Sequence, residues 1–252
     1  MYCVFSEQEI QKLQEQRKAP HRRAQTKAGI GKDYDRDGVL GELILFLLVD
    51  GFFDVPMIAH KLSGKQNYSD EVKGSDGLFY GDFGEGISFA VGEAKVNQRL
   101  KQAISSALNS INRFHGVEET RFKDQELDVA PNNLSQNLSE EQVGKISKIV
   151  DEDQVAEYNL RHPIFICYES DQIKQINDEE HDADELKRKI NNHLKNKDFV
   201  NEVEDSFSEE TKEMTGIDLM FLFLPVKDIN KFRQKVLRNI DPALGHVMGE
   251  DL

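Results

Sequence analysis

Apolar residues recur along the chain with the spacing of amphipathic helices. Between residues 39 and 51 they are Leu40, Leu43, Ile44, Leu47 and Leu48. This i, i+3, i+4, i+7, i+8 stripe is typical of a helix that packs on a core, and Gly51 closes it. A second stripe predicts a long helix over roughly residues 98–114. We also expect helices over residues 7–18, 139–150, 184–203 and 228–239.

Short apolar runs predict the strands of a sheet. Residues 77–80 and 87–91 are two such runs, and the turn-rich segment 81–86 between them predicts a β-hairpin. Further strands are expected over residues 55–62, 163–168 and 218–226, the last two as unbroken apolar runs typical of interior strands. The order of elements predicts an α/β fold with a mixed sheet flanked by helices.

Length and composition limit the organisation of the chain. With 252 residues it can bury one sizeable core. We expect residues 1–36 to form an N-terminal helix and basic arm, and residues 37–252 to form one domain with an acidic insertion at about 116–160. The apolar run 43–49 is too short to cross a bilayer. The N-terminus lacks the pattern of a signal peptide, so we expect a cytoplasmic protein.

The formal net charge of −14 argues against a protein that coats nucleic acid by itself. Basic residues nevertheless cluster in the N-terminal arm and around the second long helix, where they are Lys95, Arg99, Lys101 and Arg113. This separation would permit local phosphate contact while a partner subunit provides most of the grip on the nucleic acid. The alternative is that these charges are solvated surface.

The predicted hairpin carries the residues with the clearest chemical meaning. Asp76 precedes its first strand, and Glu93-Ala94-Lys95 continues its second. With the turn near Gly84, antiparallel pairing sets Asp76 roughly opposite Gly92 and Glu93. Glu93 and Lys95 are two residues apart on a strand and therefore share one face.

Two carboxylates and an ammonium at one place predict metal-dependent hydrolysis of phosphodiesters. Carboxylate oxygens are the hard ligands that Mg²⁺ or Mn²⁺ prefers. Such an ion polarises the phosphate and lowers the pKa of the water that attacks it. Lys95 can position that water or neutralise charge that develops on the phosphate.

Glu42 is a further candidate because it lies close to the apolar stripe of its helix, where a carboxylate is costly unless a cation or hydrogen bonds satisfy it. The alternative is a helix edge in solvent. Residues 33–38 match the opening of a calcium-binding loop, but Ile44 stands at the twelfth position, where a glutamate belongs. No histidine shows metal-ligand spacing, and His60 and His115 are expected to be hydrogen-bonded polar residues or phosphate contacts.

The order of elements resembles the PD-(D/E)xK nuclease superfamily, which has a restriction-endonuclease-like fold. The shared features are a helix with an acid, three strands that carry an Asp and a Glu-x-Lys, and then a helix and a strand. The resemblance runs from about Val39 to Tyr168. More narrowly, Gly41–Ile44, Lys73–Gly77 and Val91–Lys95 resemble HamA, the nuclease subunit of the Hachiman antiphage defence system. This resemblance implies a Mg²⁺-dependent DNA nuclease that works with a helicase, HamB, which controls it. The sparse positive charge favours a complex over a free nuclease, and we expect a heterodimer.

The resemblance also implies roles for single residues. Asp76, Glu93 and Glu42 match the metal-binding acids, and Lys95 matches the catalytic lysine. Ser75 stands where the superfamily has its proline, which is a departure from the motif. Either Gln98 or Gln102 resembles the glutamine of a fourth motif that some relatives have. The alternative to an enzyme is a nuclease-like scaffold whose main role is to bind the helicase through its acidic surface.

Overall fold

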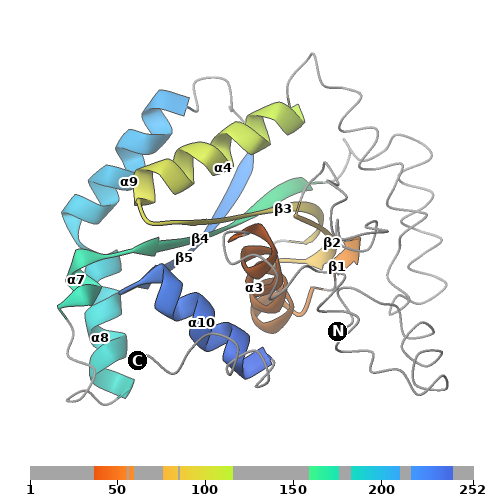
Figure 1. Ribbon diagram of the computed structural model, residues 1–252. Helices are drawn as coiled ribbons and strands as arrows, with labels where there is room; N and C mark the ends of the chain where they lie inside the picture. Colours follow the sequence, from red (N-terminus) through yellow and green to blue (C-terminus); the bar gives the residue numbers. More distant parts are fainter. Residues whose placement is uncertain are drawn as a thin grey trace, which may run out of the picture.

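The computed structural model describes residues 37–55, 57–59, 76–84, 86–115, 159–175, 183–210 and 217–240. These residues form a mixed α/β structure in which helices lie on both faces of a five-stranded sheet (Figure 1). The strands are β1 (Met57–Ala59), β2 (Gly77–Asp82), β3 (Ile87–Asn97), β4 (Asn159–Glu169) and β5 (Asp218–Val226). The helices are α3 (Asp37–Phe53), α4 (Leu100–His115), α7 (Asp171–Lys174), α8 (Ala183–Leu194), α9 (Lys197–Glu210) and α10 (Ile229–Ile240). The predicted restriction-endonuclease-like fold class is confirmed.

The sheet has the order β1-β2-β3-β4-β5. Strand β2 pairs antiparallel with both β1 and β3, whereas β3, β4 and β5 run parallel to one another. The predicted hairpin is formed by β2 and β3, with Gly77 opposite Gly92 and Asp82 opposite Ile87. Its turn needs glycine, because Gly84 and Gly86 have φ values of +96° and +104°. Asp82 Oδ1 accepts the N–H groups of both glycines, at 2.8 and 2.9 Å.

The sheet separates two hydrophobic cores. Helices α3 and α10 cover one face, and α4 and α9 cover the other (Figure 1). The buried side chains of the α3 core include Leu45, Val49, Phe79, Ala94 and Phe165. Those of the α4 core include Ile104, Leu108, Ile111, Ile164 and Ile166. Because side chains alternate along a strand, Ala94 faces α3 and its neighbours Glu93 and Lys95 face α4.

Helix α3 lies unusually close to β3. A Cβ atom added to Gly92 would lie 2.8 Å from both Leu45 Cδ2 and Phe79 Cε2. A Cβ atom on Gly41 would lie 3.2 Å from the side chains of Ala94 and Val96. The absence of a side chain at these two glycines therefore lets the helix pack directly onto the strand that carries the Glu-x-Lys motif.

Two predictions about the second half of the chain need correction, and one short helix there was not predicted. The single helix expected over 184–203 is wrong, because the chain forms α8 and α9 with a break at Lys195 and Asn196. Asn196 causes the break: its Oδ1 accepts the Asp198 N–H at 3.0 Å and so caps α9. Strand β5 is not interior, since it lies at the edge of the described sheet, although its side chains contribute to both cores. The short helix α7 was not predicted.

Other predictions fall outside the described residues. They are the helices over 7–18 and 139–150, the N-terminal arm, the loop at 33–36 and residues 116–158 of the acidic insertion. The domain boundaries at 1–36 and 37–252 therefore stay predictions. None of the helices in the described ranges has the length and apolar character that crossing a membrane requires.

Candidate active site

Asp76 is held against β3 by two hydrogen bonds. Strand β2 begins at Gly77, opposite Gly92, so β3 continues beyond the end of its hairpin partner. The Asp76 side chain takes the place of that partner: its Oδ2 accepts the Ala94 N–H at 2.8 Å. The Asp76 N–H donates to the Gly92 carbonyl at 3.0 Å. These bonds fix the carboxylate beside the Glu-x-Lys motif, as the hairpin register predicts.

Glu93 is buried between this carboxylate and helix α4. It is 8% exposed and forms an ion pair with the Lys95 ammonium, so the predicted shared face of these two side chains is confirmed. The Ser110 hydroxyl of α4 lies within hydrogen-bonding reach of Glu93. The pKa of Glu93 is raised from its ordinary value of 4.5 to about 7, first by burial and next by the charge of Asp76, while Lys95 and Ser110 oppose this rise.

The crowding of Asp76 and Glu93 fits a divalent metal ion. Both side chains offer hard oxygen donors, and a dication would relieve the repulsion that disfavours the ionised pair. Magnesium is often bound by one or two carboxylates together with substrate phosphates, so two acids are sufficient for a site of this kind. Within the described residues, no group of three His, Cys, Asp or Glu side chains converges into a metal site.

Within the described residues, Glu42 does not form one group of metal ligands with Asp76 and Glu93. It is 2% exposed, so the prediction that it lies toward the buried side of its helix is confirmed. Helix α3, however, covers the face of β3 that carries Ala94 and Val96, the opposite face from Glu93. Its assignment as a metal ligand therefore stays a prediction. Gln98 and Gln102 are both exposed, and the structure does not favour either of them.

Next to the site, the β3–β4 ladder is interrupted. Its register runs to Ala90 with Arg161 and resumes at Glu93 with Ile164, so it skips His162 and Pro163. Proline has no N–H to donate, so a proline in an interior strand leaves an acceptor on the neighbouring strand unsatisfied. The fully buried His162 supplies the missing donor, with its Nδ1 atom 3.2 Å from the Val91 carbonyl oxygen.

This contact fixes the protonation of two histidines that the sequence did not single out as a pair. A carbonyl oxygen only accepts, so we assign the proton of neutral His162 to Nδ1. Its Nε2 then accepts from the Nε2–H of His115, at 2.8 Å. Burial lowers the pKa of His162 to about 3, so it is neutral at physiological pH. Pro163 inside an apolar strand is the sequence signal that could have revealed the need for a nearby donor.

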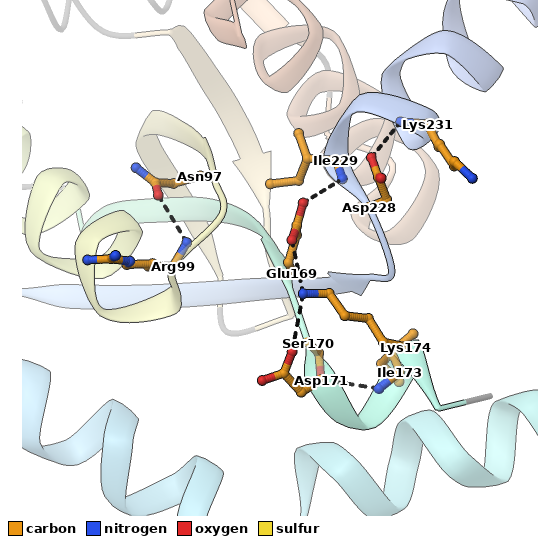
Figure 2. Close-up of polar contacts among 10 residues, drawn as sticks. All are labelled: Asn97, Arg99, Glu169, Ser170, Asp171, Ile173, Lys174, Asp228, Ile229 and Lys231. Carbon is orange, nitrogen blue, oxygen red and sulfur yellow. Dashed lines mark hydrogen bonds and ion pairs between the residues drawn. The ribbon is translucent and has the colours of Figure 1, made fainter.

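The carboxyl ends of the parallel strands have a structural role instead. Ligands often bind at this edge in α/β proteins, but here its polar groups cap helices (Figure 2). Glu169 Oε1 accepts the Ile229 N–H of α10 at 3.2 Å, and Lys174 forms an ion pair with Glu169 at 3.1 Å. Asp228 Oδ1 accepts the Lys231 N–H at 2.9 Å. The acid pair on the hairpin is therefore the better candidate for chemistry.

The fold and the hairpin motif define a restriction-endonuclease-like α/β protein with an Asp and a Glu-x-Lys triplet on adjacent strands. The chain belongs to the HamA family, whose model matches residues 1–240. This match confirms the resemblance to HamA that the sequence suggested. The family is one of Hachiman defence components. A comparison with curated protein sequences found no match.

Proposed function

We propose that the protein is a metal-dependent deoxyribonuclease of a Hachiman defence complex, which hydrolyses phosphodiester bonds under the control of a helicase partner. The proposal is supported most by one observation. Asp76 and the Glu93–Lys95 ion pair meet on the β2–β3 hairpin of a HamA-family chain. A buried acid pair with an adjacent ammonium is costly for a fold, and it is typical of sites that handle phosphate.

In the proposed reaction each of the three side chains has a separate task. Asp76 and Glu93 would hold Mg²⁺ or Mn²⁺, which supplies Lewis acidity toward the phosphate and toward water. The Lys95 side chain is 27% exposed, so its ammonium can contact both Glu93 and an incoming phosphate oxygen. There it would orient the attacking water and neutralise charge that develops on the phosphate. The water oxygen forms a bond to phosphorus, the bond to the leaving sugar oxygen breaks, and that oxygen takes up a proton.

A helicase partner would compensate for the acidity of the chain. With a net charge of −14, the protein has little electrostatic attraction for DNA over most of its surface. A partner that grips DNA would supply the affinity and decide when the hairpin site meets a phosphodiester. The scaffold alternative uses the same surface for docking and gives the acid pair no chemical task.

A cleavage assay tests the proposal. The full chain, with and without the helicase partner, is incubated with supercoiled, linear and single-stranded DNA in Mg²⁺ or in EDTA. We expect cleavage that requires Mg²⁺ and falls roughly 100-fold or more in Glu93→Gln and Lys95→Ala. The exposed Lys197 of α9 provides a control, and Lys197→Ala should cut normally.

Two results would contradict the nuclease proposal. Unchanged cleavage by Glu93→Gln and Lys95→Ala would show that the activity comes from elsewhere. A chain that binds the helicase but cuts no substrate in any condition would favour the scaffold.

A further inference from the structure

The last turns of α4 form a polar surface beside Glu93. Ser110 Oγ donates a hydrogen bond to the Ser106 carbonyl at 3.2 Å and lies close to the Glu93 carboxylate, whose pKa it lowers. The same hydroxyl accepts a hydrogen bond from Arg113 Nη2 at 3.3 Å. Arg113 therefore contacts the residue of α4 that lies close to the buried carboxylate. Ser110 and Arg113 are three residues apart, which places them next to each other on one face of the helix.

Arg113 retains most of its donor capacity. Its side chain is exposed, and within the described part of the chain no carboxylate forms an ion pair with it. Lys95, the other cation of the site, is paired with Glu93. A guanidinium has five N–H donors in a planar fork that matches phosphate geometry, and Ser110 occupies only one of its two terminal nitrogens. The orientation that Ser110 imposes would thus hold a phosphate-binding group ready at the edge of the site.

We propose that Arg113 is a substrate-binding residue, whose guanidinium contacts a backbone phosphate of the nucleic acid next to the bond that is cut. Ser110 acts as a positioning residue that links this contact to Glu93. The proposal rests on the proposed nuclease function. A purely structural role is the alternative, because a cation in the last turn of a helix also stabilises the helix dipole.

Salt-dependent DNA binding separates the two roles. Binding of the full chain to a labelled duplex is followed by fluorescence anisotropy in EDTA at several KCl concentrations. The slope of log K against log salt is negative, and each lost phosphate contact reduces its magnitude by about 0.9 for duplex DNA. We expect Arg113→Ala to show this smaller slope and a several-fold weaker affinity. Arg113→Lys should keep most of the slope, because it keeps the charge. Lys231→Ala, which removes an exposed cation of α10 on the opposite face of the sheet, should change neither quantity.

The outcomes distinguish this proposal from the nuclease proposal. If the wild type cuts DNA in Mg²⁺ and Arg113→Ala matches it in affinity, salt slope and KM, the role of Arg113 is wrong and the nuclease proposal stands. If Arg113→Ala lowers the affinity and the slope but no form of the chain cuts DNA, the phosphate contact stands and the nuclease proposal fails. Equal affinities of the wild type and Arg113→Ala, including no measurable binding by either, overturn the role of Arg113.

Discussion

Glu93 lies where burial and a neighbouring carboxylate both oppose its ionisation. Its pKa in the fold is about 7, above the ordinary value of 4.5, so the native state holds the proton more tightly than the unfolded chain does. Stability linked to this group is therefore greatest below about pH 4.5, and it is lost as the pH rises through 7. A fold that keeps such a group ionised at neutral pH needs a compensating positive charge, which Lys95 provides in part and a dication would complete.

Replacing Glu93 with glutamine tests this balance at the residue scale. Glu93→Gln keeps the shape of the side chain but removes the ionisation. In EDTA, the thermal midpoint of Glu93→Gln minus that of the wild type should increase from pH 5 to pH 8. The reason is that only the wild type carries the unfavourable charge at pH 8. The midpoints are measured by circular dichroism at both pH values. A difference that stays constant across this range would mean that Glu93 ionises as easily in the fold as in the unfolded chain.

At the scale of secondary structure elements, the strand that carries the triplet depends on a side chain to complete its ladder. Pro163 removes one donor from β4, and His162 replaces it at the Val91 carbonyl, two residues before Glu93. His115 at the end of α4 then holds His162 from the other side. The contact links β3, β4 and α4, so its loss would also shift Glu93.

A double-mutant cycle tests whether the His162 side chain takes the place of the backbone donor that Pro163 lacks. His162→Ala leaves the buried Val91 carbonyl without its donor and should lower the free energy of unfolding by roughly 1–3 kcal/mol. Pro163→Ala restores a backbone N–H to β4, so the cost of His162→Ala should be smaller in the Pro163→Ala background. Urea unfolding of the four proteins measures the coupling. Equal costs in both backgrounds would show that His162 stabilises the fold only by packing.

At the scale of the whole molecule, sequence patterns predicted the elements whose signals are local. The hairpin followed from glycines that adopt positive φ between two apolar runs, and its register placed Asp76 beside Glu93. The division between α8 and α9 was missed because it depends on one capping side chain, Asn196, in a polar stretch that otherwise has helical character. The contacts that Ser110 and His162 make beside the site could not be predicted either, because they arise where α4 and β4 pack against β3, and contacts between distant segments leave no periodic signal.

The account as a whole requires that Asp76 and Glu93 bind a divalent cation together. Mn²⁺ titration of the full chain, followed by calorimetry, measures this directly and does not depend on substrate, partner or trigger. We predict saturable binding by the wild type that becomes at least about tenfold weaker in both Asp76→Asn and Glu93→Gln. The exposed Glu204 of α9 serves as the control, and Glu204→Gln should bind Mn²⁺ normally. Mn²⁺ binding that is equally tight in Asp76→Asn, Glu93→Gln and the wild type would contradict the account.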